Sequence, residues 1–475
     1  MTKQRHAHLI GICGTAMASL AGMLKQRGYL VSGSDAAAYP PMSDFLASQG
    51  IAIAQPFGES NLSPQPDFVV VGNAISRGNV ELEFALDQRL PLKSLPQLLY
   101  DEFLAGHERL VVAGTHGKTT TSSLLAWLFS EGQRAASFLI GGIPENFGSS
   151  FHLGNGPEFI LEGDEYDSAF FDKGPKFLHY FPDGLILTSV EFDHADIYRN
   201  LDEVKTAFKR LVNLIPQRGR LIAWDGHPNV DECISHARCK VERYGFGETS
   251  TWRVAEVQYR PDCTRWSVLR DGRAWAEFEF RLAGEYNVLN ATAAAAMAAQ
   301  YGIGVTAIAR ALRGFRSVKR RLEVRSEAHG ITIVEDFAHH PTAIAQTLKA
   351  LRTRYDGRRL WAILEPRSNT LRRRVFQHEL AESLGIADQV ILAGIFKSDA
   401  IPEDERLHPE VVVGDLQQAG KPARLLPAVD EIVDVISPEL AEGDVVAILS
   451  NGGFGGIYEK LPARLKQLHE VPART

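Results

Sequence analysis

A short glycine-rich segment, GTHGKTT at residues 114–120, constrains this chain more than any other feature. It stands between a buried-strand pattern at residues 110–113 and an amphipathic helix pattern at residues 122–132. Glycines let backbone N–H groups approach an anion, and the start of a helix adds partial positive charge. A strand, a glycine turn and a helix in this order therefore predict a phosphate-binding loop in an α/β domain.

The residues of this loop have distinct expected roles. Lys118 can neutralise charge on the β- and γ-phosphates of a nucleotide, and the Thr119 hydroxyl is placed to ligate Mg²⁺. The segment departs from the strict GxxxxGK[ST] pattern, because Val112 stands where that pattern has its first glycine. The residues that we expect to bind the nucleotide are Gly114, Thr115, His116, Gly117, Lys118, Thr119 and Thr120.

Two acidic clusters follow other strand patterns of the same domain. EGDEYD at residues 162–167 follows the pattern at 159–161, and EFDHAD at residues 191–196 follows the one at 184–188. Ligands of α/β sheets bind beyond the carboxyl ends of the strands, so both clusters are expected near the loop. Oxygen ligands suit Mg²⁺, which makes Glu162 a candidate ligand. His194 can join such a site, although histidine is an uncommon ligand of Mg²⁺.

The length of 475 residues suggests about three domains, and the patterns divide into three α/β units. In the first, the turn GICGTAM at residues 11–17 lies in a strand–turn–helix–strand series that ends at Asp35, as in a Rossmann-type unit. In the second, residues 251–282 alternate like antiparallel strands. The predicted domains are 1–107, 108–316 and 317–475.

Composition excludes several classes of protein. The formal net charge of −7 argues against nucleic acid or an anionic membrane as a partner. Four cysteines without CxxC spacing form neither a disulfide framework nor a zinc–cysteine site, and no apolar run reaches the ~18 residues of a membrane span. A cytoplasmic enzyme is expected, of unknown oligomeric state. Two basic triplets, at 319–321 and 372–374, are expected to be solvated helix faces.

Three more motifs, together with the loop, make the chain resemble the Mur ligase superfamily, the ATP-dependent amide-forming ligases of peptidoglycan assembly. GEYNVLNA at 284–291, KRRLE at 319–323 and DFAHHP at 336–341 resemble family segments and occur in the family's order. The resemblance covers nearly the whole chain. It implies an α/β fold with a Rossmann-like N-terminal domain, a P-loop ATPase central domain with a small antiparallel sheet, and a Rossmann-like C-terminal domain.

The same resemblance implies a substrate for each domain: the UDP-sugar, ATP and the incoming amine, in chain order. Gly11, Gly14 and Met17 would bracket the UDP diphosphate. Glu162 and His194 would ligate Mg²⁺ with Thr119. Asn287 and Asn290 would lie near adenine, with helix capping as the alternative, while Arg321 and Asp336 would reach the γ-phosphate and the ribose. Many members also carry a carbamylated lysine, for which Lys209 and Lys205 compete.

Two subgroups of the family use UDP-N-acetylmuramate directly. Residues 162–173, 364–370 and 450–457 resemble the subgroup that ligates the murein tripeptide L-alanyl-γ-D-glutamyl-meso-diaminopimelate during recycling of the cell wall. The alternative is the subgroup that ligates free L-alanine. Asp35 and Asn73 lie in segments that resemble the first subgroup and are further substrate-binding candidates. Arg367 can bind a substrate carboxylate bidentately, and Asn451 opens a glycine turn whose N–H groups suit an anion.

The implied mechanism passes through an acyl phosphate, which the amine of the tripeptide then attacks. Lys118, His194, His339 and Arg321 are the catalytic candidates, and His194, His339 and the carboxylates near Glu165 compete as the base that deprotonates the amine. Because substrates from three domains must converge, domain closure is expected. Two other classes of function stay open: a nicotinamide oxidoreductase built on the first glycine turn, and a non-catalytic nucleotide-binding regulator.

Overall fold

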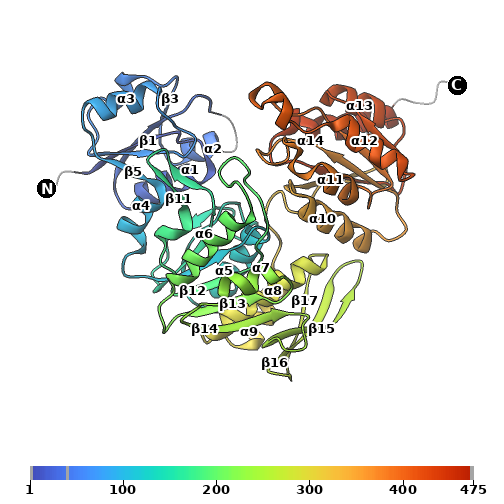
Figure 1. Ribbon diagram of the computed structural model, residues 1–475, viewed down its shortest axis with the longest axis horizontal. Coiled ribbons are helices and arrows are strands. Elements are labelled where there is room, and N and C mark those ends of the chain that lie inside the picture. The colour runs from blue at the N-terminus through green and yellow to red at the C-terminus, as the bar shows by residue number, and fades with distance from the viewer. Residues whose placement is uncertain (1–3, 39–41, 471–475) are drawn as a thin grey trace.

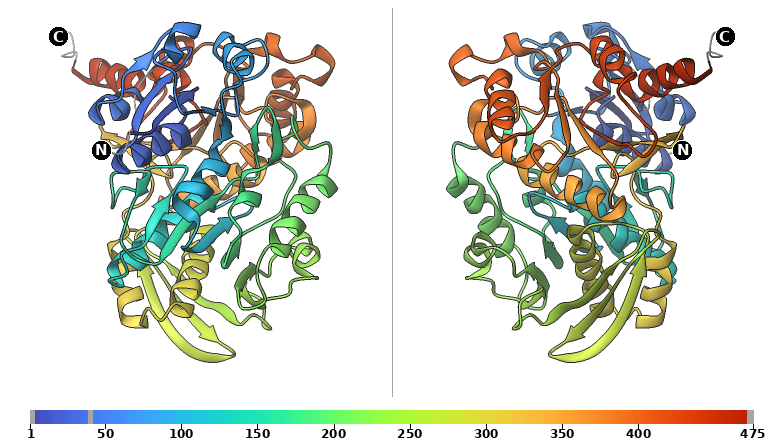
Figure 2. Two further views of the ribbon diagram at one scale, coloured as in Figure 1. Left: turned by 90° about the vertical axis from the view of Figure 1, so that its left-hand side faces the viewer. Right: turned by 90° about the vertical axis from the view of Figure 1, so that its right-hand side faces the viewer.

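The computed structural model describes residues 4–38 and 42–470 and contains three α/β units (Figure 1). The N-terminal and C-terminal units both adjoin the same side of the central unit, and the long strands β15–β17 extend from its far end (Figures 1 and 2). Within these residues, no helix is both long and apolar enough to cross a membrane. The predicted three-unit α/β fold is confirmed, and the exact domain limits stay a prediction.

The N-terminal unit is a parallel sheet of five strands in the order β3-β2-β1-β4-β5. The strand order reverses between β1 and β4, so the loops after these two strands flank the position where such sheets bind ligands. The strands are β1 (His6–Ile10), β2 (Leu30–Ser34), β3 (Ile53–Ala54), β4 (Phe68–Val71) and β5 (Leu92–Ser94). The helices are α1 (Thr15–Gln26), α2 (Met42–Ser48), α3 (Val80–Asp87) and α4 (Leu95–Leu99), with short turns at Glu59–Leu62 and Tyr100–Leu104.

The central unit has a ten-stranded sheet in the order β17-β16-β15-β14-β13-β12-β6-β9-β7-β8, with β10 and β11 as a separate hairpin. Strands β12, β6 and β9 are parallel neighbours, and β15–β17 are antiparallel as the alternation predicts. The strands are β6 (Glu108–Ala113), β7 (Ser137–Leu139), β8 (Phe151–His152), β9 (Glu158–Gly163), β10 (Asp167–Ala169), β11 (Asp172–Pro175), β12 (Gly184–Leu187), β13 (Arg220–Trp224), β14 (Lys240–Gly245), β15 (Trp252–Tyr259), β16 (Thr264–Arg270) and β17 (Arg273–Phe280). The helices are α5 (Lys118–Glu131), α6 (Leu201–Asn213), α7 (Pro228–Ile234), α8 (Glu285–Gln300) and α9 (Val305–Gly314), with a 3₁₀ turn at Lys176–His179.

The C-terminal unit has six strands in the order β18-β19-β23-β20-β21-β22, of which only β18 is antiparallel to its neighbour. The strands are β18 (Glu323–Ala328), β19 (Ile331–Asp336), β20 (Leu360–Leu364), β21 (Gln389–Leu392), β22 (Ala423–Leu425) and β23 (Val445–Leu449). The helices are α10 (Pro341–Arg354), α11 (Gln377–Leu384), α12 (Pro409–Gln418), α13 (Val429–Ile436) and α14 (Ile457–Glu470), with 3₁₀ turns at Arg374–Phe376, Ser398–Ala400, Glu403–Glu405 and Phe454–Gly456.

The apolar core is divided unequally among the three units. Leu20 and Phe103 of the N-terminal unit belong to the same buried cluster as Phe177 and Phe208 of the central unit. The buried members of the two C-terminal clusters all lie within residues 331–465. The N-terminal unit is therefore fixed to the central unit by shared hydrophobic burial, whereas the C-terminal unit has a core of its own.

The basic triplets are not solvated helix faces, contrary to the expectation. Arg320 lies in a turn, where its guanidinium pairs with Glu335 and donates to the carbonyl oxygens of Ser450 and Gly452. Arg372 donates to the carbonyl oxygens of Phe396 and Lys397 and to the Asn369 side chain. These guanidiniums hold loops of the C-terminal unit together, because their five N–H groups can satisfy several carbonyl oxygens at once.

Candidate active site

The phosphate loop joins β6 to α5. Neighbouring atoms leave no room for a side chain at its two glycines. Gly114 and Gly117 have φ angles of +136° and +78°. A Cβ atom at Gly114 would lie 2.2 Å from Thr188 Oγ1, and one at Gly117 would lie 2.5 Å from Asn290 Oδ1. Helix α5 begins without a side-chain cap, so its first N–H groups are free to bind an anion. The loop therefore has a backbone conformation suited to an anion, and its binding of a nucleotide phosphate stays a prediction.

Lys118 lies inside this loop. Its Nζ atom donates to the carbonyl oxygens of Gly114 (2.7 Å) and Thr115 (3.2 Å) and to Glu165 Oε1 (3.0 Å). Burial alone would lower the pKa of Lys118, but the nearby carboxylates, Glu165 first, raise it above the ordinary value. The amine is therefore a cation, held where a phosphate bound to the loop would meet it.

The candidate metal ligands are only partly assembled. Thr119 Oγ1 donates to Glu162 Oε1 (2.9 Å), and the other oxygen of Glu162 accepts from the backbone N–H of Gly141 (2.7 Å). His194 Nε2 lies instead 3.2 Å from Glu165 Oε1. Hydroxyl and carboxylate oxygens suit Mg²⁺, so Thr119 and Glu162 fit this ion, while His194 joins only if it leaves Glu165.

The charge of His194 bears on both of its expected roles. Burial would lower its pKa, but the hydrogen bond and charge of Glu165, and the charge of Asp193, raise it to about 9. At neutral pH the ring is therefore an imidazolium, which can neither bind a metal ion nor accept a proton. His194 must lose this proton before it can act as a ligand.

Several hydrogen bonds that involve side chains join the central unit to the C-terminal unit beside the loop. In three of them, a neutral side chain of the C-terminal unit donates to a carboxylate that follows β12. The bonds are Thr370 Oγ1 to Asp193 Oδ1 (2.8 Å), Asn369 Nδ2 to Asp196 Oδ2 (2.8 Å) and Thr342 Oγ1 to Glu191 Oε2 (2.7 Å). The second acidic cluster thus contacts the C-terminal unit as well as the phosphate loop.

His339 also lies near this acidic cluster, but its protonation state differs from that of His194. Its Nδ1 atom lies 2.9 Å from the carbonyl oxygen of Phe337, so Nδ1 carries the hydrogen and Nε2 the lone pair. Nε2 is 4.0 Å from Asp193 Oδ2. Burial lowers the pKa of His339 below its ordinary value. Of the two histidines predicted as the base, His339 is the one that can accept a proton.

Arg321 and Asp336 lie at the entrance of the C-terminal unit. The guanidinium carbon of Arg321 lies 5.0 Å from the centre of the Phe337 ring. The Asp336 carboxylate is only 3% exposed and accepts from the N–H of Leu322 (2.8 Å), from the N–H of Ala338 (2.9 Å) and from the hydroxyl of Thr347 (3.2 Å). Asp336 therefore orders the loop that carries Arg321, and its expected contact with ribose stays a prediction.

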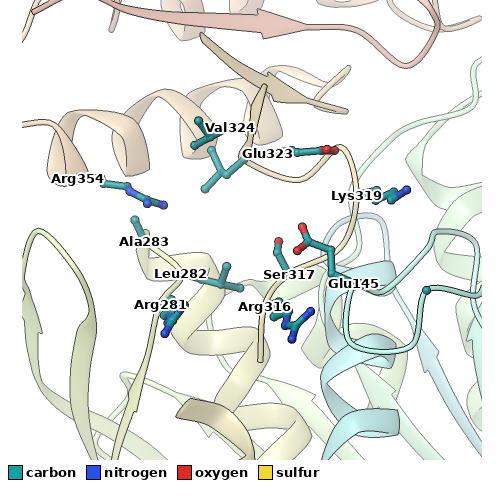
Figure 3. A pocket seen from close by; sticks show the side chains of 12 residues that line it. Glu145, Arg281, Leu282, Ala283, Arg316, Ser317, Lys319, Glu323, Val324 and Arg354 are labelled. Atoms are coloured by element: carbon teal, nitrogen blue, oxygen red, sulfur yellow. The ribbon is translucent and has the colours of Figure 1, made fainter. Parts of the chain in front are cut away.

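A cavity of about 570 Å³ lies between the central and C-terminal units (Figure 3). Four of its lining side chains are cations: Arg281, Arg316, Lys319 and Arg354. Ser317 and Lys319 line the cavity on either side of Val318, and a Cβ at Gly142 would contact both Val318 and Thr119 of the phosphate loop. Asn287 and Asn290 are buried in α8. Asn287 Nδ2 donates to the carbonyl oxygen of Ala283 (2.8 Å), which lines the cavity, and Asn290 Oδ1 would lie 2.5 Å from a Cβ at Gly117 of the phosphate loop.

The candidates of the N-terminal unit gather where its strand order reverses. A Cβ at Gly11 would contact Ile75 and Gly72, so the loop after β1 touches the loop after β4. The backbone N–H of Cys13 donates to Asp35 Oδ2 (2.9 Å), which holds the glycine turn in shape. The remaining candidates are Gly14 at the uncapped start of α1, Met17 buried in α1, and the exposed Asn73.

Sequence reasoning missed Glu81, a fully buried carboxylate beneath this glycine turn. It accepts hydrogen bonds from the hydroxyl of Ser34, the amide of Asn61 and the backbone N–H of Gly58, and it lies 3.4 Å from His8 Nε2. Burial would raise the pKa of Glu81, but these hydrogen bonds lower it. The donors come from distant segments, so no local pattern could reveal them.

The structure brings together Arg367 and Asn451, the two substrate-binding candidates of the C-terminal unit. The guanidinium carbon of Arg367 lies 3.7 Å from the centre of the Phe396 ring, and Nη1 is 3.4 Å from Glu365 Oε1. A Cβ at Gly452 would lie 2.0 Å from Arg367 Nε, so the residue after Asn451 must be glycine. Asn451 Oδ1 is buried without a hydrogen-bond partner in the described structure, as in a site that awaits a donor.

Lys209 and Lys205 form ion pairs with one carboxylate on the surface of the central unit. Their Nζ atoms lie 2.6 Å and 2.7 Å from Glu232. Carbamylation needs a neutral amine, and the hydrogen bond to Glu232 raises the pKa of Lys205 above its ordinary value. The carbamylation of Lys209 stays untested.

Comparisons with known proteins agree with this arrangement. Residues 6–105, 112–298 and 320–452 match "Mur ligase family, catalytic domain", "Mur ligase middle domain" and "Mur ligase, glutamate ligase domain". The UDP-N-acetylmuramate–L-alanyl-γ-D-glutamyl-meso-2,6-diaminoheptandioate ligase of Escherichia coli is 42% identical over 96% of this chain and 97% of its own. The UDP-N-acetylmuramate–L-alanine ligase of Methylococcus capsulatus is 31% identical over 98% and 97%. The crystal structure of a murein peptide ligase from Psychrobacter arcticus has a TM-score of 0.75, with 35% identity over 97% of this chain and 98% of that one.

The buried carboxylate of Glu81 yields a prediction about stability. Glu81→Gln replaces an acceptor by an amide whose N–H groups face the donors Ser34 and Asn61, so the free energy of unfolding at pH 7 is expected to fall by about 2–3 kcal/mol. Because the pKa of Glu81 is lowered in the fold, its contribution is present above the ordinary value of 4.5 and is lost as the pH falls through the lower folded value.

Denaturant unfolding from pH 7 to pH 4 measures this contribution. The difference between wild type and Glu81→Gln is expected to narrow below pH 4.5. Asp87→Asn, at the exposed end of the same helix, is the matched control and should change stability by less than about 0.5 kcal/mol. Equal effects of the two substitutions would contradict the role of Glu81.

Proposed function

The chain belongs to the Mur ligase family, and from that premise we propose that it joins the carboxylate of UDP-N-acetylmuramate to the amine of L-alanyl-γ-D-glutamyl-meso-diaminopimelate. It is an ATP-dependent carbon–nitrogen ligase of peptidoglycan metabolism. The observation that carries the choice of substrate is the higher full-length identity to the tripeptide ligase than to the L-alanine ligase. We place it in the cytoplasm, with domain limits at 107/108 and 316/317.

The nucleotide is proposed to bind across the central and C-terminal units. The first N–H groups of α5 and Lys118 bind the phosphates, and Thr119, Glu162 and deprotonated His194 hold Mg²⁺. Bound Mg²⁺ offsets negative charge on the phosphates. The adenosine is proposed to enter the cavity lined by Ala283 and Lys319. Arg321 is the cation of the C-terminal unit that comes nearest to the transferred phosphate once the two units close.

The reaction is proposed to take two steps. The carboxylate of UDP-N-acetylmuramate attacks the γ-phosphate, which gives an acyl phosphate and ADP. The amine then attacks this carbonyl carbon, the amide forms and inorganic phosphate leaves. His339 accepts the proton of the amine at Nε2, because Phe337 fixes its tautomer and Asp193 stabilises the imidazolium. Arg367 binds a carboxylate of the tripeptide.

The first prediction from the proposed function concerns the phosphate loop. Lys118→Ala removes the cation that the loop encloses and is expected to lower phosphate release about 10²–10³-fold or more. The fold should persist, because truncation leaves no new buried charge without donors: Glu165 keeps His194. Phosphate release and circular dichroism measure the two effects. Lys240→Ala, at an exposed site of the same unit, is the control, and near-normal turnover of Lys118→Ala would contradict the proposal.

The second prediction concerns the amine substrate. With UDP-N-acetylmuramate and ATP, the tripeptide is expected to give a higher kcat/KM than free L-alanine, because only the tripeptide offers distal carboxylates to Arg367. Arg367→Lys keeps the charge but loses the bidentate geometry, so it should reduce the preference. A preference for L-alanine in the wild-type enzyme would assign the chain to the other subgroup.

The third prediction concerns the base. His339→Gln is expected to slow ligation about 10²–10⁴-fold while UDP-N-acetylmuramate binding stays unchanged. Raising the pH should partly restore the rate, since more of the free amine is then deprotonated. Ligation rates from pH 7 to 9, with the exposed His378→Gln as control, test this expectation. A His339→Gln enzyme with wild-type rates would exclude this base.

A further inference from the structure

A second group of metal-ligating side chains lies beside the candidate magnesium site and uses none of its residues. His116 comes from the phosphate loop, Glu191 from the segment after β12 and His340 from the start of α10. Their ligand atoms all lie within 4.8 Å of one another. His116 Nε2 is 3.4 Å, and His340 Nδ1 4.0 Å, from Glu191 Oε2. The group therefore spans the contact between the central and C-terminal units.

We propose that His116, Glu191 and His340 form a binding site for Zn²⁺ or a similar borderline metal ion. Tetrahedral Zn²⁺ binds imidazole nitrogen and carboxylate oxygen at about 2.0–2.2 Å, which places neighbouring ligand atoms roughly 3.3 Å apart. The His116–Glu191 separation already matches, and His340 Nδ1 must move less than 1 Å closer to Glu191; all three ligand atoms lie within 4.8 Å of one another. Two imidazoles and one carboxylate select Zn²⁺ over Mg²⁺, which prefers oxygen ligands.

Each histidine has a ring nitrogen close to Glu191 that can bind an ion. His340 Nε2 lies 3.1 Å from the carbonyl oxygen of Phe192 and so carries the hydrogen, while Nδ1 accepts from the N–H of Thr342 (3.2 Å). His116 Nε2 is buried and has no hydrogen-bond partner among the described residues. The two rings lie 4.6 Å apart. A buried nitrogen without a partner is costly, and a metal ion would satisfy it.

The surroundings supply the outer contacts that metal ligands need. The hydroxyl of Thr342 donates to Glu191 Oε2 (2.7 Å), and the carbonyl oxygen of Phe192 orients His340 through its other nitrogen. In the described structure the His340 side chain caps α10, because Nδ1 accepts from the N–H of Thr342. An ion bound at Nδ1 would break this hydrogen bond. The ion replaces this one weak contact by a bond that joins two units of the chain.

A metal ion at this position would cross-link the central and C-terminal units next to the phosphate loop. Resting on the proposed function, in which these units close around the substrates and so must move relative to one another, bound Zn²⁺ would restrict this motion and inhibit turnover. Binding itself needs no substrate, so a failure of the metal site would leave the ligase proposal intact.

The test is a Co²⁺ titration of the full-length protein in excess Mg²⁺, followed by visible absorption. The wild-type protein is expected to bind one equivalent with the strong bands of tetrahedral Co²⁺, and Zn²⁺ is expected to displace it. His340→Gln and Glu191→Gln should each weaken binding by more than the roughly 10–100-fold that loss of an outer contact causes. His194→Gln, in the magnesium site, and the exposed His378→Gln should keep the bands.

Two results would overturn the proposal. One is an absence of tetrahedral bands in the wild-type protein. The other is loss of the bands in His194→Gln with retention in His340→Gln, which would place the ion in the magnesium site. Circular dichroism of each variant shows that it is folded, and the two ligand variants come from different units, so a folding defect in one leaves the other informative.

Discussion

The phosphate loop can bind an anion only if its backbone N–H groups stay accessible. Several residues of the central unit hold the loop in the conformation that keeps them so. Thr188 and Asn290 approach the two loop glycines so closely that no Cβ fits. Glu165 holds Lys118 in the loop, and Glu162 holds the first hydroxyl of α5. Because β6, β9 and β12 are parallel neighbours, the groups that follow them reach one edge of the sheet without any long connection.

The sequence predicts those parts that rest on local patterns. The central strands were predictable, because parallel strands buried on both faces are continuous apolar runs. The short strands β7, β8 and β22 carry too few residues for such a pattern. Helix α5 begins at Lys118 rather than near residue 122, since the last residues of the loop form its first turn. The family and the three-unit fold were predictable from ordered motifs alone.

The sequence identified the candidate site residues but not the contacts among them. Glu162, His194 and Lys118 were expected together, yet the carboxylate that joins Lys118 to His194 is Glu165. Partners such as Thr370 for Asp193 lie 177 residues away in sequence, and no periodicity relates them. Charge state is equally non-local: the same residue type is an imidazolium at 194 and a neutral base at 339, because carboxylates raise the pKa of the first while burial lowers the pKa of the second.

The unequal division of the apolar core has a consequence for the energetics of the whole chain. The N-terminal and central units share one buried cluster that includes residues from Ala7 to Ile234, and Val318 still packs against the central unit. After Val318 the buried apolar residues belong to two clusters whose buried members all come from the C-terminal unit. Local stability follows continuous burial rather than the number of sheets. The C-terminal unit can therefore move relative to the other two without exposing a shared buried cluster, and polar side-chain contacts beside the phosphate loop are the ones that such a motion would break.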